Sequence, residues 1–417
     1  MSEASDLRKE GYEQARELLW QLATDDGFLA STVTHDNYRR IWARDGVIIG
    51  LAALMTGIDS LIDTMRKTLK TLADHQGEHG EIPSNVDTRT SRISYGGTTG
   101  RVDADLWFVI GCAEYWLATG DDEFLAEMLP SLERVRFLLG AWEFNDRGLI
   151  YVPQTGDWAD EYLQTGYILY DQLLYLQALR SFCRIHHHVH GSADHQLEDR
   201  TTRLRHLIRS NYWFNGVEPE DVYHEVLYHK GREAAPHRES RYWMPFFSPT
   251  GYGYRFDAFA NVLAGMFGVA EASETEHVDQ YIGEITPDQL SLLPAFHPVI
   301  EPVDHDWEHL QMMFSYSFKN NPYEFHNGGL WPMITGFYVA DLVARGHSVK
   351  ARRYLDGIHG ANALPMDGEP WAFPEFVHGK KLTAGGNRCQ GWSAAAAVMA
   401  HHAIEGQPLI REAGAWA

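Results

Sequence analysis

Carboxylates and an aromatic side chain crowd into one short segment near the middle of the chain, residues 156–162. Asp157, Asp160 and Glu161 stand there beside Trp158. A carboxylic acid can lend a proton to a leaving oxygen while an indole stacks on the apolar face of a ring, so this combination suits sugar chemistry. The alternative is that Asp157 or Asp160 caps the helix that follows and that Trp158 packs in the core. The segment alone leaves both interpretations open.

Similar polar and aromatic segments recur along the chain, each just before a strongly apolar run. They contain Arg, Asp, His, Asn and Trp, which suit a ligand that has both polar groups and apolar faces. Any one Asp among them could be a helix cap, but together the segments indicate one shared site. The candidate binding residues are Tyr38, Trp42, Arg44, Asp45, Arg101, Asp105, Asp157, Trp158, Gln172, His326, Asn327, Trp331, Gln390 and Trp392.

These candidates differ in the role that their chemistry suggests. Asp45 follows Arg44 and can accept hydrogen bonds from paired sugar hydroxyls. His326 and Asn327 precede two glycines, where the backbone can approach a ligand closely. The tryptophans that could stack on a ring, although Trp is also common in cores, are Trp42, Trp158, Trp331 and Trp392. The weaker candidates for the same cleft are Arg101, Asp105, Gln172 and Gln390.

Apolar runs that predict buried helices alternate with runs that have a single apolar face. A helix that is apolar all round is buried, whereas one with a polar face lies outside. We expect the apolar helices at residues 45–57, 103–119, 167–185, 256–270, 330–345 and 391–403. We expect the amphipathic helices at residues 7–24, 59–73, 121–140, 195–211, 276–292 and 348–360. Strand signals are few, at residues 149–153 and 222–228.

This alternation predicts an all-α fold, a closed (α/α)6 toroid of the six-hairpin type with few short strands. No repeat of fixed period is present, which disfavours an open solenoid. No linker rich in Gly, Pro or Ser divides residues 1–417, so we expect a single domain. In a toroid the loops at one end of the inner helices frame a central cleft. The polar and aromatic segments would meet there.

Composition narrows the classes of partner. The formal net charge of -22 argues against nucleic acid and against anionic membrane surfaces, because both attract clustered Lys and Arg. The aromatic content of 12% is a rich supply for a cleft that binds rings. The first residues are acidic and polar and no apolar run approaches membrane-spanning length, so we expect a cytoplasmic location. The expected partner is a small sugar, and the oligomeric state stays open, since a homo-oligomer is compatible with the sequence.

Neither a metal nor a cofactor is expected. Cys112, Cys183 and Cys389 are scattered, without a disulfide framework or the spacing of metal ligands. The His-rich run at residues 186–190 has no carboxylate or Cys beside it, which favours a surface position over a metal site. The acidic residues 121–123 are expected in the first turn of a helix.

The order of the motifs resembles that of the neutral/alkaline invertases, glycoside hydrolase family 100. Residues 38–45, Tyr-Arg-Arg-Ile-Trp-Ala-Arg-Asp, are similar to the opening Tyr-x-x-Val-Trp/Phe-x-Arg-Asp of that family. Residues 326–332, His-Asn-Gly-Gly-Leu-Trp-Pro, match its most specific motif, and residues 390–395 match its closing Gln-x-Trp-Ser-x-Ala. Debranching α-1,6-glucosidases and mannosyl- and glucosylglycerate hydrolases share a looser version of this pattern.

The resemblance implies an (α/α)6 glycoside hydrolase with two catalytic carboxyl groups. It places the general acid at Asp160 and the general base at Glu375, in the segment Phe-Pro-Glu-Phe. If the pair straddles a water, the two groups should lie roughly 6.5–9.5 Å apart and the product should be inverted. The pKa of the acid should be raised by apolar and like-charged neighbours, for which Trp158, Asp157 and Glu161 are the candidates. Asp157 is the rival for the acid role.

Departures from the invertase pattern put the substrate in question. Residues 103–105, Asp-Ala-Asp, stand where invertases have Pro-Val-Asp-Ser. Residues 160–162, Asp-Glu-Tyr, stand where invertases have Asp-Arg-Arg-Met. The expected substrate is therefore a small neutral α-glycoside, sucrose or a related α-glucoside. A debranching-type or glycerate-type α-glucosidase of the same clan is the alternative.

Two further readings use the same toroid differently. A sugar epimerase or isomerase would need His326, His378 and His401 to converge on one sugar carbon. A sugar-binding protein with an inactive site would need Asp160 and Glu375 not to face each other.

Overall fold

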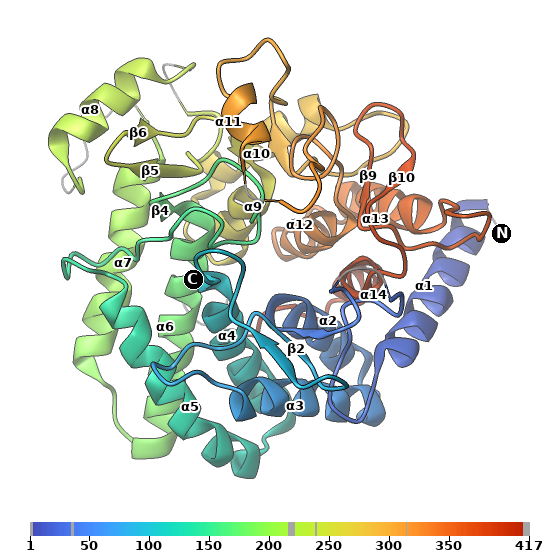
Figure 1. Cartoon of the computed structure of the whole chain (residues 1–417), viewed down its shortest axis with the longest axis horizontal. Coiled ribbons are helices and arrows are strands. Elements are labelled where there is room, and N and C mark those ends of the chain that lie inside the picture. The colour runs from blue at the N-terminus through green and yellow to red at the C-terminus, as the bar shows by residue number, and fades with distance from the viewer. Residues whose placement is uncertain (1–2, 35–36, 216–221, 238–239, 314, 412–417) are drawn as a thin grey trace.

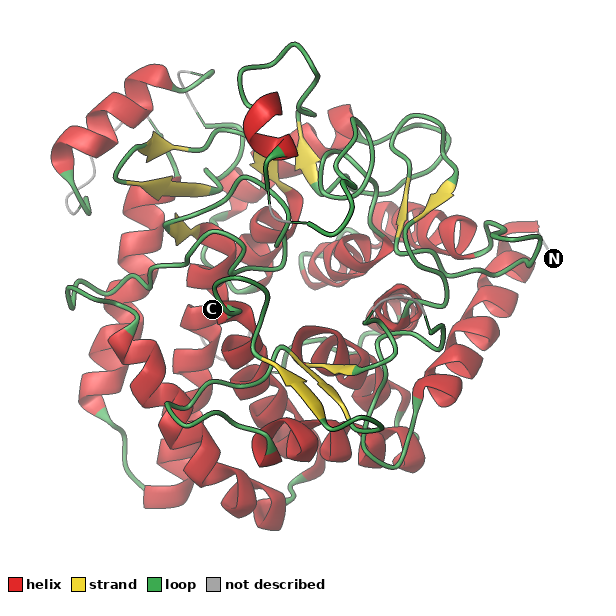
Figure 2. Cartoon of the chain, viewed as in Figure 1, coloured by secondary structure: helices red, strands yellow, loops and turns green. Residues whose placement is uncertain are grey.

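The computed structural model describes residues 3–34, 37–215, 222–237, 240–313 and 315–411. Its helices form two concentric rings, and short strands lie in the loops above them (Figures 1 and 2). The inner ring consists of α2 (Ala43–Thr56), α4 (Val102–Thr119), α6 (Leu169–His190), α9 (Ala258–Met266), α12 (Pro332–Ala344) and α14 (Gly391–Ile404). Each inner helix packs on the next in chain order, and α14 returns to pack on α2, so the ring is closed.

The outer ring consists of α1 (Glu3–Leu22), α3 (Asp59–Asp74), α5 (Asp122–Ala141), α7 (His195–Tyr212), α10 (Ala272–Ile285) and α13 (Ser348–Asn362). The expected alternation of inner and outer helices is confirmed, with helix ends within a few residues of the predicted ranges except at the C-terminal ends of α6, α9 and α10. The chain therefore adopts the predicted all-α toroid.

Burial explains why the sequence pattern separates the two rings. In α2 every residue from Ala43 to Met55 is buried, and in α4 every residue from Val102 to Trp116. The outer helix α3 buries a single face, which includes Leu61 and Leu69. Each fully buried Leu contributes about 1.5–3 kcal/mol, so helices that bury all sides hold the toroid together from within.

Short antiparallel strands fix the places where inner helices begin. β1 (Ile41–Trp42), β4 (Tyr167–Ile168) and β7 (Phe256–Asp257) each end at the residue before α2, α6 and α9. The remaining strands are β2 (Asn85–Asp87), β3 (Arg92–Ser94), β5 (Phe246–Ser248), β6 (Gly251–Tyr252), β8 (Phe296–His297), β9 (Phe376–Val377) and β10 (Ala384–Gly385). The strands pair in the orders β1-β2-β3, β4-β5-β6, β7-β8 and β9-β10. These pairs hold the polar segments at one end of the ring.

Both strands expected from the sequence are wrong. Residues 149–153 form an irregular segment with a single bridge, between Val152 and Gly166. Of the segment 222–228, residues from Glu225 onward belong to α8 (Glu225–Ala234), which His224 caps by accepting from the Leu227 N–H at 3.3 Å. This side-chain cap turns the segment toward helix. A further short helix, α11 (Trp307–Gln311), was also not predicted.

Two smaller expectations can be checked directly. Asp121 is the N-cap of α5, and its side chain accepts a hydrogen bond from the Phe124 N–H at 2.9 Å. In the part of the chain that the structure describes, no helix has the length and apolar character that crossing a membrane requires.

A close backbone contact between two inner helices generates a prediction about stability. A Cβ on Gly336 of α12 would lie 2.8 Å from both the Cα and the Cβ of Ala396 on α14. We expect Gly336→Ala to lower the free energy of unfolding by about 1–3 kcal/mol, because the backbone of α14 must shift. Gly283 of α10 has nothing within 4 Å of such a Cβ, so Gly283→Ala should instead raise stability by about 0.5 kcal/mol.

Urea unfolding of the two variants and the parent protein measures both effects. A Gly336→Ala variant as stable as the parent would mean that α12 and α14 lie farther apart than described.

Candidate active site

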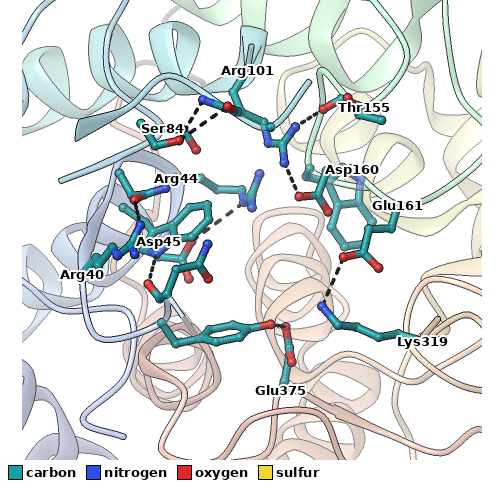
Figure 3. A pocket seen from close by; sticks show the side chains of 18 of the residues that line it. Arg40, Arg44, Asp45, Ser84, Arg101, Thr155, Asp160, Glu161, Lys319 and Glu375 are labelled. Atoms are coloured by element: carbon teal, nitrogen blue, oxygen red, sulfur yellow. Dashed lines mark hydrogen bonds and ion pairs between the residues drawn. The ribbon is translucent and has the colours of Figure 1, made fainter. Parts of the chain in front are cut away.

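A cavity of about 580 Å³ opens at the N-terminal ends of the inner helices. Sequence candidates that line it are Tyr38, Trp42, Arg44, Asp45, Arg101, Trp158, Asp160, His326, Trp331, Glu375 and Trp392. These residues come from segments far apart in the chain. The polar and aromatic segments therefore do meet in one place, as Figure 3 shows for the charged members.

The remaining candidates are not among the lining residues. Asp105 accepts a hydrogen bond from the Ile82 N–H at 2.9 Å. Gln172 bonds both backbone groups of Ile150, and Asn327 bonds both backbone groups of Ile300. Such bonds hold loops against the helices beneath them. Gln390 is the N-cap residue of α14 and is fully buried. Its side-chain amide has no hydrogen-bond partner among the described residues.

Asp160 enters the cavity from one side and is held there by Arg101. Arg101 donates to Asp160 Oδ2 through Nη2 and to the Thr155 carbonyl through Nη1. Burial by itself would raise the pKa of Asp160, but Arg101, with smaller effects from His326 and Arg44, outweighs burial and lowers it. The expectation that this pKa is raised is therefore wrong for the unliganded site, where Asp160 is ionised at neutral pH.

Glu375 enters the same cavity from another side and is positioned by hydrogen bonds at both oxygens (Figure 3). The Tyr38 hydroxyl donates to Oε1 at 2.8 Å, and the Asn387 N–H donates to Oε2 at 3.1 Å. Burial raises the pKa of Glu375, and these donors together with Lys319 only partly oppose it. Gly386, with φ of 72°, passes so close that a Cβ there would lie 2.4 Å from Oε2.

The floor of the cavity is charged. Arg44 Nη1 lies 2.7 Å from Asp103 Oδ2, and Arg44 Nε lies 4.0 Å from Asp45 Oδ2. Burial raises the pKa of Asp45 to about 6, although Arg44 opposes the rise. Asp45 therefore presents a mostly ionised acceptor at neutral pH to any hydroxyl that reaches the floor.

Aromatic rings line the deep part of the cavity. His326 stacks on Trp331 with ring centroids 5.5 Å apart, and Trp158 meets both rings edge-on. The ring centroids of Trp392 and Trp331 lie 5.4 Å apart. Burial lowers the pKa of His326 to about 3, so this imidazole is neutral and its Nδ1 has no partner among the described residues. Trp158 is buried in the core and also borders the cavity, so stacking on a sugar ring stays a prediction.

Asp157 takes no part in helix capping, contrary to the capping alternative. It is buried and accepts a hydrogen bond from Gln164 Nε2 at 2.8 Å, while the N-cap residue of α6 is Ile168. Burial and then the nearby Asp103 raise the pKa of Asp157, and burial likewise raises that of Asp171, so these side chains favour the protonated form. The sequence could not distinguish this buried acid from Asp160, three positions on.

Several lining residues were missed. Lys319 pairs with Glu161 at 3.2 Å and faces the cavity from an irregular segment that carries no helical or strand pattern. The other missed residues include Arg40, Ser84, Asn85, Arg92, Ser94, Tyr316 and Ser317. Many lie on the β1-β2-β3 sheet, whose strands of two and three residues are too short to leave a periodic signal.

The sequence raised two other possible roles for histidines, in a metal site and in an epimerase site. His188 contacts Asp122 at 2.8 Å and His186 contacts the Ser192 carbonyl, so the run at residues 186–190 is spread over the surface. Among the described residues, the one group with three possible metal ligands close together is His305, Asp306 and His309, which is largely exposed.

The epimerase histidines do not converge. His401 stacks on Tyr12 in the last turn of α14, about 14 Å along the helix from Trp392 at 1.5 Å per residue. His378 lies 4.0 Å from Glu324, and only His326 of the three lines the cavity.

Comparisons with known sequences agree on one family. The profile described as alkaline and neutral invertase matches residues 221–407, a segment that contains His326 and Glu375 but not Asp160. Probable alkaline/neutral invertase D of Arabidopsis thaliana is 24% identical over 425 residues, covering 88% of this chain and 76% of the relative. Cytosolic invertase 1 of Oryza sativa subsp. japonica is 25% identical over 422 residues, covering 88% and 72%.

Solved structures support the fold independently. A bacterial glucoamylase bound to acarbose superposes with a TM-score of 0.67 at 14% identity, covering 96% of this chain and 56% of the glucoamylase chain. A mannosylglycerate hydrolase from Thermus thermophilus bound to Tris has a TM-score of 0.62 at 14% identity, covering 93% and 99%. With this cavity and these relatives, the chain is a glycoside hydrolase with an (α/α)6 toroid fold, similar in sequence to the alkaline and neutral invertases.

Proposed function

We propose that the chain hydrolyses a small α-glucoside with inversion, with Asp160 as the general acid and Glu375 as the general base. One observation carries the proposal: two carboxylates enter a single cavity from different sides, and a binding floor lies beside them (Figure 3). Inverting hydrolysis needs this arrangement, because the acid and the water-activating base act on opposite faces of the sugar ring. An inactive binding protein would have no use for it.

The floor suits the sugar unit that is released. Asp45 accepts hydroxyl protons, and neutral His326 offers an unpaired ring nitrogen at its side. Trp331 and Trp392 supply apolar faces for the ring. Because these residues close the inner end of the cavity, the proposed substrate is short and enters by its non-reducing end.

Glu375 is arranged as a base. Each of its oxygens accepts one hydrogen bond, from Tyr38 and from the Asn387 N–H, and each keeps a second lone pair for a water. The raised pKa of Glu375 makes it a stronger proton acceptor than an ordinary carboxylate once it is ionised.

Asp160 must gain a proton before it can act as an acid, and Arg101 opposes this in the unliganded site. We propose that the bound substrate separates the pair, so that Arg101 turns toward the leaving group and Asp160 faces the glycosidic oxygen. Without the guanidinium, burial dominates and the pKa of Asp160 rises, as its role requires.

The relatives named as invertases make sucrose the first substrate to test, and a glycerate-linked or debranching-type glucoside remains the alternative. One relative is named as cytosolic, which supports our proposal of a cytoplasmic location.

Removing either carboxylate should abolish turnover without unfolding the protein. We expect Asp160→Asn and Glu375→Gln each to lower kcat by about 10²–10⁴, since each change keeps the shape and removes the proton donor or the base. Asp157→Asn should cost less than about tenfold, because that residue only bonds Gln164 beneath the cavity. Sucrose hydrolysis and circular dichroism of the variants provide the measurement. Parent-like rates in either of the first two would remove that residue from the mechanism.

The stereochemistry of the product provides a second test. An inverting enzyme converts an α-glycoside first to the β-anomer, because water attacks from the face opposite the leaving group. Proton NMR during the first minutes, before mutarotation, should therefore show β-glucose. If α-glucose comes first, one carboxylate acts as a nucleophile instead.

The pH dependence of kcat, which reports the enzyme–substrate complex, separates the roles of the two carboxyl groups. Tyr38→Phe removes a hydrogen bond that favours ionised Glu375, so the pKa of Glu375 rises further. A base must be ionised, so the low-pH limb should move to higher pH. Asp160, as the acid, must be protonated and sets the high-pH limb, which Tyr38→Phe should leave in place because the Tyr38 hydroxyl donates to Glu375. If Tyr38→Phe instead moves the high-pH limb, Glu375 is the acid and the assignment is reversed.

A further inference from the structure

We propose that the leaving-group end of the cavity binds an anionic group, a carboxylate or a phosphate, on a wall formed by the β1-β2-β3 sheet. This inference rests on the proposed function, which places the sugar on the floor. The wall consists of Arg40, Ser84, Asn85, Arg92 and Ser94, all of which line the cavity, and we call it the arginine wall. Figure 3 shows Arg40 and Ser84 on the side opposite Glu161 and Lys319.

Depth within the cavity assigns the wall to the leaving group. The floor residues Asp45 and Trp392 are both buried, at 4% exposure, whereas Arg92 is exposed at the rim. Between Arg92 and Arg101 the lining continues through Ser94, Gly96 and Gly97. A leaving group that departs from Asp160 therefore extends past Arg101 along this segment toward Arg92.

The other basic residues of the cavity are already neutralised by carboxylates. Arg44 pairs with Asp103 at 2.7 Å, and Lys319 pairs with Glu161 at 3.2 Å. Arg101 pairs with Asp160. Arg44 and Lys319 therefore need no anion from a substrate, whereas Arg101, once it turns from Asp160, faces the leaving group beside the arginine wall.

The arginine wall is different, because its cations outnumber the carboxylates near them. Arg92 has no carboxylate within 4.0 Å among the described residues. Arg40 reaches only Asp87, at 4.0 Å, and the Asp87 carboxylate is already engaged by Arg89 at 3.2 Å. The three guanidinium groups thus share one carboxylate.

The crowding of positive charge acts on Arg40. Its side chain is 14% exposed, and burial, followed by repulsion from Arg92, lowers its pKa. A half-buried guanidinium beside a second cation is relieved by an anion, which Arg binds with paired, charge-assisted hydrogen bonds. Arg40 Nη1 donates to Asn85 Oδ1 at 2.9 Å, which leaves the Asn85 amide N–H groups and the hydroxyls of Ser84 and Ser94 in the lining as further donors.

The concentration of positive charge stands out in a chain with a formal net charge of -22. A purely neutral leaving group, such as the fructose of sucrose, would use the wall only for hydrogen bonds and leave its excess charge unbalanced.

Two matched pairs of substrates test the proposal and distinguish its two chemical sources. Glucosylglycerate and glucosylglycerol differ by a carboxylate, and sucrose phosphorylated on its fructose differs from sucrose by a phosphate. We expect kcat/KM for the anionic member of one pair to exceed that of its neutral partner by about tenfold or more. The pair that shows the preference identifies the anion.

Arg92→Gln should lower this preference by about tenfold, because it removes the unpaired cation at the rim. Arg39→Gln is the matched control: it makes the same change of charge next to Arg40 in the chain, but Arg39 is exposed and does not line the cavity. The control should keep the preference within about twofold, since an exposed charge outside the cavity is largely screened from a bound anion by solvent and salt. Neutral members that react as fast as anionic ones in the parent, or equal losses in both variants, would overturn the proposal.

The same wall can be tested without catalysis. Calorimetry with D-glycerate and with inorganic phosphate should detect binding that Arg92→Gln weakens about tenfold and Arg39→Gln does not. If none of the four glucosides is hydrolysed while this binding pattern holds, the proposed function fails and the anion site stands. If neither probe binds, or both variants weaken binding equally, the anion site fails whatever the enzyme hydrolyses.

Discussion

A buried ion pair between Arg44 and Asp103 joins the inner helices directly beneath the cavity. Arg44 starts α2 and Asp103 starts α4, and the Tyr170 hydroxyl of α6 donates to the same carboxylate at 3.2 Å. The Arg44 guanidinium also lies over the Trp392 ring of α14, 5.7 Å from its centroid. Removing one partner of such a pair would leave an uncompensated buried charge, at a cost of about 3–5 kcal/mol. One guanidinium therefore fixes the relative positions of four helix ends.

As a consequence, the residues of the cavity floor are held in position together and not one by one. Asp45 follows Arg44 in α2, so the pair that locks α2 to α4 also sets where the Asp45 carboxylate points. Trp107 Nε1 extends the network by donating to Tyr170 at 2.8 Å. Buried networks of this kind add little net stability compared with apolar packing, and here Arg44 Nε has no hydrogen-bond partner among the described residues.

The sequence predicts the rings well because burial on all sides leaves an unmistakable pattern. Helices such as α4 have hardly a polar residue beyond their first turn, so their existence and their inner position follow from composition. The strands are missed because two or three residues cannot show a period of two. Within the site, motifs identify the neighbourhood but not the side that each residue faces. Asp160 and His326 reach the cavity, while Asp157 and Asn327 bond the scaffold below it.

Charge is arranged at two scales that act in opposite directions on an anionic substrate. The net charge of -22 repels an anion at long range, but at physiological ionic strength that repulsion fades beyond about 8 Å. Inside the cavity Arg40 and Arg92 act at contact distance, where solvent screens them much less. Long-range attraction therefore contributes nothing to capture, and any preference for a charged leaving group must come from direct contacts. Selectivity of this origin depends on two side chains of one small sheet, so it can change during evolution while the floor, the carboxylates and the toroid stay as they are.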